Sequence, residues 1–344
     1  MSAIKQILLR ALTSAPAARA LSPLMRGRCA IFMLHRFQQP ELGVQGHQPE
    51  ILRATLGYLR RQRYQLLSLE ELFVRLAGEG PPPDRAVAFT VDDGYADQAT
   101  TGAPIFAEFD CPATTFVTTG FLDGLVWFWW DRIEFVFEQT RKEALDISLN
   151  GSGLRYAWSD PAGRQGAQHD FTERCKEVSE VEKLAGILRL AAAAEVDLPE
   201  RVPDRYAPMT WNQLRSCEQR GMRYGPHTVT HPVLARTGDD QAETELRDSW
   251  SRLQSEAGKP VPVFCYPNGR LLDFGSREVA ELRRLGFIGG VTGVPGYAAR
   301  ASFGAGPGAP FEVPRFSYCE SLHQNLKLAS GGERLRELLS GGLA

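Results

Sequence analysis

Short runs of apolar residues that end directly in polar side chains are the feature that most limits how this chain folds. Residues 30–34 (AIFML) end at His35, and residues 86–91 (AVAFTV) end at Asp92. Runs this short and continuously apolar are typical of strands buried on both faces of a parallel sheet. Segments with helical periodicity, such as 50–62, lie between the runs. The pattern predicts parallel βα units, arranged as a barrel or as an open sheet.

This rhythm changes between residues 120 and 208. The segment 145–158 carries Asn150-Gly151 at its centre, which predicts a β-hairpin. The segment 170–194 has a helical pattern. Because the core of such a stretch would be small, we interpret 120–208 as an insertion in the α/β fold rather than as an independent domain.

Charge and cysteine content narrow the functional class. The chain of 344 residues has 39 Lys and Arg against 41 Asp and Glu, a net charge of −2, which does not favour nucleic acid as a partner. Its six cysteines are scattered singly, without a CxxC pair. In a chain this long, that spacing indicates reduced thiols and therefore a reducing compartment.

The N-terminal residues show no stretch of transmembrane or signal-peptide length. Within residues 4–12 the apolar side chains share one helical face, and the basic ones lie away from it (Ile4, Ile7, Leu8 and Leu12; Lys5 and Arg10). Two interpretations stay open: a helix on a membrane surface, or a frayed helix packed on its own domain. We expect a cytoplasmic protein, attached in the first case to the inner face of the membrane.

The polar residues that follow the predicted strands indicate an active site, because sites of parallel α/β folds form at the carboxyl ends of strands. Adjacent carboxylates at Asp92 and Asp93 repel each other; one could cap the next helix, or a metal could bind one and leave the other as a base. His227 and His231, four residues apart, converge if a tight turn follows the strand. An HxxxH pair alone is weak evidence for a metal site, but two imidazoles and a carboxylate are a common ligand set for a catalytic metal.

Several motifs resemble the polysaccharide deacetylase (NodB-homology, carbohydrate esterase) family. TVDDGY at 90–95 resembles its TFDDG motif, and HTVTH at 227–231 resembles its H-[ST]-x-x-H motif. Four further segments resemble motifs of the family, and all six stand in the family's order: MLHR at 33–36, WWD at 129–131, FCYPNG at 264–269 and VPR at 313–315. It implies a distorted (β/α)7-type barrel and metal-dependent removal of N-acetyl groups from a sugar, a polysaccharide or a lipid-linked glycan precursor.

Together with the residue patterns at the two ends, the resemblance leads us to expect three parts of the chain. Residues 1–28 are an N-terminal amphipathic segment, 29–318 are the deacetylase barrel with its insertion, and 319–344 are a helical tail interrupted by Gly331-Gly332. The sequence gives no prediction of the oligomeric state.

Each motif position implies a role. Asp92 would be the general base, and Asp93, His227 and His231 would hold the metal, Zn²⁺ by default, with Co²⁺, Ni²⁺ or Fe²⁺ also suited to the set. A metal would act as a Lewis acid on the amide carbonyl, and the backbone N–H of Asn268 would help stabilise the oxyanion. The remaining candidates for contact with substrate or oxyanion are Tyr266, Tyr95, Arg315 and Trp129.

Two departures from the family pattern concern the general acid and the residue that orients the base. Many relatives carry the acid in a Leu-x-His motif, but here Leu322-His323 follows no predicted strand. His35 is the better candidate for this acid, although it could instead be a structural histidine.

The family often places an arginine four residues before the proline of the third motif, where this chain has Val263. Arg315 or Arg36 could replace it. The neighbouring tryptophans at 127, 129 and 130 suit either a sugar-stacking groove or a core, and we expect at least one to be buried.

Two other functional classes stay open. The chain could be a catalytically silent barrel that binds carbohydrate, or a hydrolase of a non-sugar amide. The complete set of base, ligands and candidate acid favours the sugar deacetylase.

Overall fold

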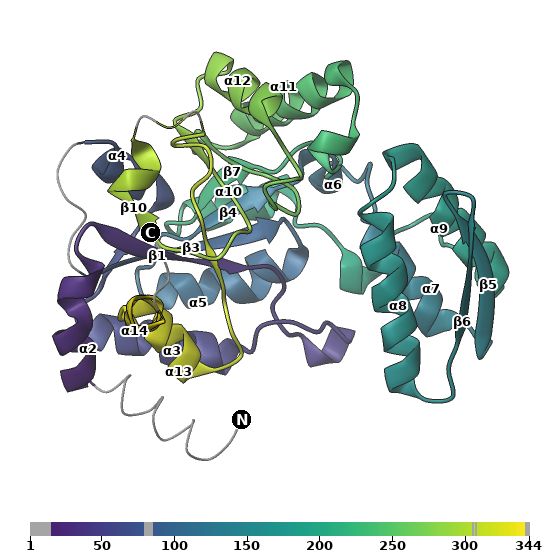
Figure 1. Ribbon diagram of the computed structural model, residues 1–344, viewed down its shortest axis with the longest axis horizontal. Coiled ribbons are helices and arrows are strands. Elements are labelled where there is room, and N and C mark those ends of the chain that lie inside the picture. Colours follow the sequence, from purple (N-terminus) through teal and green to yellow (C-terminus); the bar gives the residue numbers. More distant parts are fainter. Residues whose placement is uncertain (1–14, 79–84, 305, 307, 341–344) are drawn as a thin grey trace.

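The computed structural model describes residues 15–78, 85–304, 306 and 308–340 (Figure 1). The segment 4–12, for which we considered membrane contact, lies outside these residues. No helix within them is both long enough and apolar enough to cross a membrane.

Parallel strands form a distorted barrel, which confirms the fold class predicted from the sequence. β1 (Arg28–Leu34), β3 (Ala86–Asp93), β4 (Thr114–Val117) and β7 (Arg223–Pro226) are consecutive neighbours. An isolated bridge between Tyr224 and Pro260 leads from β7 towards the next pair of strands.

The remaining strands bring the pairing back to β1. β8 (Val263–Cys265) pairs with β9 (Gly289–Val291), and a bridge joins Val291 to Val313. Three residues later β11 (Phe316–Ser317) pairs with β1. Two short strands flank this ring: β2 (Gln65–Leu67) beside β3, and β10 (Ala298–Ala299) antiparallel to β1.

Alternate side chains of β1 and β3 pack into two different hydrophobic clusters. Phe32 and Phe89 belong to the cluster under the outer helices, whereas Ile31 and Ala88 belong to the cluster inside the barrel. All eight residues of β3 are buried. Burial on both faces explains why these strands read as continuous apolar runs.

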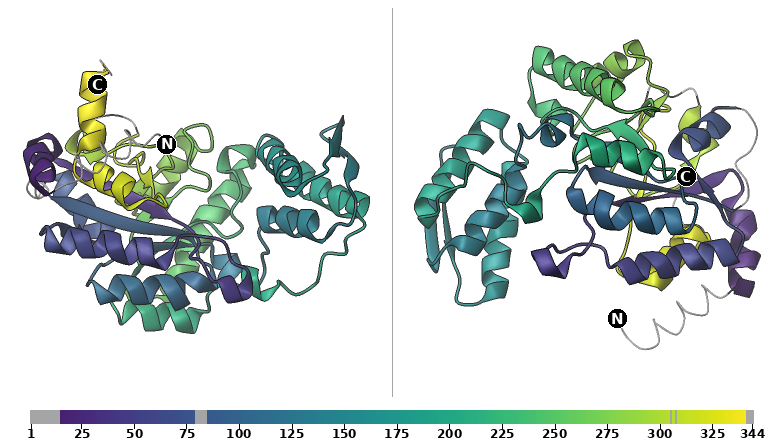
Figure 2. Two further views of the ribbon diagram at one scale, coloured as in Figure 1. Left: turned by 90° about the horizontal axis from the view of Figure 1, so that it is seen from below. Right: turned by 180° about the vertical axis from the view of Figure 1, so that it is seen from behind.

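Helices cover the outside of the barrel, with α3, α5 and α13 on one side and α11 and α12 on the other (Figures 1 and 2). The barrel helices are α3 (Pro49–Arg61), α4 (Leu69–Ala77), α5 (Ala103–Glu108), α6 (Thr119–Leu122), α10 (Trp211–Glu218), α11 (Asp239–Glu256) and α12 (Ser276–Arg284). The terminal helices are α2 (Ala15–Leu21), α13 (Leu322–Ala329) and α14 (Gly332–Leu339). Ser68 caps α4 by accepting a hydrogen bond from the backbone N–H of Glu71.

The insertion forms a lobe beside the barrel (Figure 1). It consists of α7 (Trp129–Gln139), the hairpin of β5 (Ala144–Leu149) and β6 (Ser152–Ala157), α8 (Pro161–Cys175) and α9 (Glu180–Ala194). The hairpin confirms the prediction, since Asn150 and Gly151 take the positive φ angles (51° and 76°) that its turn requires. The lobe encloses its own hydrophobic cluster, which includes Ile133 and Phe171.

Two elements differ from the sequence prediction. The helix expected over 170–194 is two helices, because Ser179 caps α9 and accepts a hydrogen bond from the backbone N–H of Glu182. Strand β3 does not end before the aspartates: Asp92 and Asp93 pair with Phe116 and Val117 of β4. The two carboxylates therefore belong to the barrel wall itself.

The separate core of the lobe generates a stability prediction. Phe171→Ala removes a fully buried ring from this cluster and should lower the free energy of unfolding by about 3–5 kcal/mol. Val181→Ala, at an exposed position of α9, should change it by less than about 0.5 kcal/mol. Denaturant unfolding followed by circular dichroism measures both values; equal effects of the two substitutions would contradict the packing described here.

Candidate metal centre and active site

A pocket of about 380 Å³ opens at the carboxyl ends of the barrel strands, between the barrel and the lobe. Every residue predicted from the sequence for the site lines it: His35, Asp92, Asp93, Tyr95, Trp129, His227, His231, Tyr266, Asn268 and Arg315. These residues come from segments that are far apart in the chain, and the barrel brings them together.

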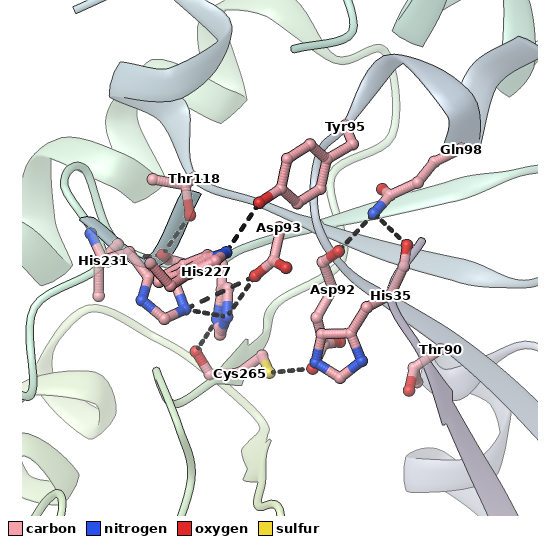
Figure 3. A network of polar contacts seen from close by, with 12 residues as sticks. His35, Thr90, Asp92, Asp93, Tyr95, Gln98, Thr118, His227, His231 and Cys265 are labelled. Carbon is pink, nitrogen blue, oxygen red and sulfur yellow. Dashed lines mark hydrogen bonds and ion pairs between the residues drawn. The ribbon is translucent and has the colours of Figure 1, made fainter. Parts of the chain in front are cut away.

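Asp93, His227 and His231 form a compact group of potential metal ligands (Figure 3). The two Nε2 atoms of the histidines lie 3.1 Å apart, and Oδ1 of Asp93 lies 3.7 Å from that of His227 and 3.6 Å from that of His231. Donor atoms at tetrahedral zinc, with bonds of about 2.1 Å, are separated by roughly 3.4 Å. The spacing therefore suits a single ion.

A strained loop makes the two histidines converge. Thr228 and His231 have φ angles of 66° and 60°, and Oγ1 of Thr228 accepts a hydrogen bond of 2.9 Å from the backbone N–H of His231. Glu245 of α11 holds the same loop by accepting hydrogen bonds from the backbone N–H groups of Val229 (2.7 Å) and Thr230 (2.9 Å). Strained backbone of this kind persists only where surrounding contacts fix it.

The protonation states of the group fit a cation. Nδ1 of His227 lies 2.7 Å from the carbonyl oxygen of Cys265, so Nδ1 carries the proton and Nε2 presents its lone pair. Burial lowers the pKa of His227 to about 4 and that of His231 well below its usual value, which keeps both imidazoles neutral. Burial, and then the neighbouring Asp92, raise the pKa of Asp93. A cation would relieve this repulsion, so the donor set fits a metal ion.

Asp92 is held by a buried bidentate ion pair with Arg315. The two guanidinium Nη atoms donate hydrogen bonds of 2.8 Å to the two carboxylate oxygens. Burial alone would raise the pKa of Asp92, but the charge and hydrogen bonds of Arg315 outweigh it and hold this pKa far below its ordinary value. Arg315 is itself fixed by the hydroxyl of Thr90 and the carbonyl of Thr292, each at 2.9 Å.

Of the two arginines considered from the sequence, Arg315 is thus the one that contacts Asp92. Arg36 instead donates to Asp97 (2.6 Å) and to the carbonyl oxygen of Arg205 (2.6 Å).

His35 follows β1, and its ring lies beside the Asp92 carboxylate (Figure 3). The side chain of His35 is accessible to solvent through the pocket, but the surrounding protein atoms displace part of its hydration. This desolvation lowers the pKa of His35, whereas the negative charge of Asp92 raises it. Gln98 fixes both residues, because its Nε2 donates to the backbone carbonyls of His35 (2.7 Å) and Asp92 (2.5 Å). Gln98 was not singled out from the sequence, where the available signal was a polar residue at the start of the helix that follows the aspartate motif.

The aromatic candidates divide between the pocket and the core. The hydroxyl of Tyr95 donates to Asp131 (2.8 Å) and accepts from Nε1 of Trp130 (2.9 Å), so both its hydrogen-bonding directions are used. Trp129 is 5% exposed, whereas the ring of the half-buried Trp130 lies edge-on to His231 with centroids 4.7 Å apart. Trp130 is therefore the tryptophan that contacts His231, one of the potential metal ligands, and it was not singled out from the sequence.

Residues after β8 complete the pocket. The ring of Tyr266 stacks on Phe274 with centroids 3.7 Å apart and lies in the hydrophobic cluster beneath α12, so the ring is part of the core. Asn268 has a φ of 58°. Among the described residues none accepts a hydrogen bond from its backbone N–H, which leaves this donor available to a ligand.

Residues 198–287, which include His227, His231 and Asn268, match the family model described as polysaccharide deacetylase. Over these residues the match confirms the resemblance drawn from the motifs, and the matched family consists of hydrolases that are generally metal-dependent. No curated protein sequence matches the chain.

Three solved structures share the fold. The deacetylase PplD of Streptococcus pyogenes, in complex with acetate, has 19% identity and a TM-score of 0.57, covering 88% of this chain and 98% of its own. IcaB of Ammonifex degensii has 16% identity and a TM-score of 0.53, covering 88% and 97%. A de-N-acetylase of Aggregatibacter actinomycetemcomitans has 14% identity and a TM-score of 0.52, covering 87% and 99%. At these identities the likeness establishes the fold.

The ligand group predicts that a metal stabilises the fold. Zn²⁺ at 100 times its dissociation constant should stabilise the wild type by about 2.7 kcal/mol and raise its melting temperature. Asp93→Ala should abolish both this shift and the binding of one metal per chain, as measured by elemental analysis. The control Asp146→Ala, at an exposed position of the hairpin, should keep both. An equal zinc-dependent shift in Asp93→Ala would place the metal elsewhere.

Proposed function

We propose that this protein is a metal-dependent hydrolase that removes N-acetyl groups from a glycan. The observation that carries the proposal is the position of an ionised carboxylate, Asp92, in the same pocket as the ligand group of Asp93, His227 and His231. The match to the polysaccharide deacetylase model supports the reaction. We propose Zn²⁺ as the metal, because the set of two imidazoles and one carboxylate is common at catalytic zinc.

The residues around the pocket fit the steps of amide hydrolysis. A divalent cation held by Asp93, His227 and His231 would polarise the acetyl carbonyl and lower the pKa of a water molecule. Asp92 accepts the proton of the attacking water, since Arg315 keeps its carboxylate ionised and fixes both of its oxygens. The free backbone N–H of Asn268 donates to the oxygen on which negative charge develops.

His35 completes the reaction by protonating the leaving nitrogen. An amide anion is too basic to leave, so this proton is essential. The lowered pKa of His35 makes its imidazolium a strong proton donor, and the Asp92 charge beside it favours that charged form. Within the described residues, His35 is the histidine that lines the pocket apart from the two proposed metal ligands.

We further propose a cytoplasmic location. Its support is the set of six cysteines, which form no disulfide in the part of the chain that the structure describes. Peripheral attachment to the inner face of the membrane through residues 4–12, and a lipid-linked glycan precursor as substrate, are proposals that rest on the sequence.

Two variants should distinguish the role of the proposed base, Asp92, from that of the proposed metal ligand, Asp93. Asp92→Asn should retain about one metal per chain but lower kcat for acetate release from N-acetylglucosamine oligomers by roughly 10²–10⁴-fold. Asp93→Ala should lose metal and acetate release together. Elemental analysis and an enzymatic acetate assay measure the two quantities. Metal-loaded wild-type protein that binds the oligomers without releasing acetate would instead indicate a silent carbohydrate-binding barrel.

The acid is tested by comparing two histidines. His35→Asn should lower kcat by at least about 100-fold, because the leaving amine loses its proton donor. His323→Asn, in the first turn of α13, should leave kcat unchanged. A large loss of activity in His323→Asn with none in His35→Asn would reverse the assignment of the acid.

A further inference from the structure

The lobe supplies one wall of the pocket. Helix α7 contributes Asp131 and Glu134, helix α8 contributes Thr172, and the residue that caps the end of α8 is Lys176. In Figure 1, α8 lies on the face of the lobe that is turned towards the barrel. A substrate bound over the ligand group therefore has α8 along one side.

The polar face of α8 continues beyond the pocket. Gln165, His169, Thr172 and Lys176 follow one another at intervals of four, three and four residues, which places them on one narrow helical face. All four are exposed or partly exposed, while Phe171 and Cys175 point into the core of the lobe. At 1.5 Å per residue, this face extends for about 16 Å. We call these four residues the α8 face.

The two residues of the α8 face that line the pocket retain hydrogen-bonding capacity. The hydroxyl of Thr172 donates to the carbonyl of Gln168 (2.8 Å), which leaves its oxygen as an acceptor. The ammonium of Lys176 donates to Glu173 (2.5 Å) and has further N–H groups. Sugar hydroxyls both donate and accept hydrogen bonds, so they match this pair.

The charges around the pocket favour an uncharged ligand. The Lys and Arg side chains that line the pocket are already paired with carboxylates: Arg36 with Asp97, Lys176 with Glu173, Arg205 with Glu134, and Arg315 with Asp92. A uronate or phosphate group would have to compete with these carboxylates for a cation, at an additional desolvation cost.

We propose that the α8 face is the binding site for the sugar residues that adjoin the one being deacetylated, and that the substrate is an uncharged oligomeric glycan. The inference rests on the proposed deacetylation. Thr172 and Lys176 bind the nearest neighbouring sugar, and His169 and Gln165 bind the sugars beyond it. The lobe thereby makes longer oligomers better substrates than a single N-acetylated sugar.

The test compares acetate release from N-acetylglucosamine and from its pentamer. For the double variant Thr172→Ala/Lys176→Ala, kcat/KM on the pentamer should fall about 10- to 50-fold through a higher KM, as expected for two lost hydrogen bonds. Its kcat/KM on the monomer should fall much less than on the pentamer, because the monomer lacks the neighbouring sugar. The conservative variant Thr172→Ser/Lys176→Arg should retain most of the preference for the pentamer.

Arg174→Ala is the matched control, because Arg174 lies on the opposite face of α8 with its side chain 51% exposed. It should behave as the wild type. An unchanged kcat/KM of the double variant on the pentamer overturns the inference, and so does tighter binding of an oligomer that carries uronates.

A binding measurement separates this inference from the proposed reaction. Trp129 and Trp130 line the pocket, so the pentamer should change the tryptophan fluorescence. If the wild type releases no acetate but the double variant binds the pentamer about 10-fold more weakly, the α8 face stands and the reaction fails. If acetate is released but both proteins bind and turn over the pentamer alike, the reaction stands and the α8 face fails.

Discussion

The buried ion pair between Arg315 and Asp92 connects the architecture of this protein to its chemistry. Arg315 lies on the last segment of the barrel, 223 residues after Asp92, just before β11 pairs with β1. Removing one partner of such a pair leaves an uncompensated buried charge, which typically costs about 3–5 kcal/mol. The contact that orients the proposed base is therefore also one that holds the barrel closed, and the site is complete only when the last strand has docked.

Much of the barrel and of the site could be predicted from local sequence. Burial on both faces produces apolar runs that mark the strands, and the polar residues at their ends identify His35, Asp92 and His227. What local sequence could not give depends on tertiary contacts. The choice of Arg315 over Arg36 follows from how the barrel closes, and the roles of Gln98 and Trp130 follow from which strand ends meet.

The lobe shows a different limit of sequence reasoning. Its hairpin was predicted because Asn-Gly has a specific turn geometry. Helix α8 was only partly predicted, since its first half contains Gly163 and Gly166 and buries little more than Ala167. A helix whose opposite face remains polar has a weak apolar periodicity, although that polar face lies along the pocket.

The separate hydrophobic cluster of the lobe has a consequence for how such proteins diverge. Because the lobe closes its own core, substitutions there perturb the packing of the barrel little, while they reshape one wall of the pocket. Selection can therefore act on the two parts at different rates. In lineages that adopt new glycan substrates, we therefore expect most substitutions in the lobe, while the barrel keeps the residues of the reaction.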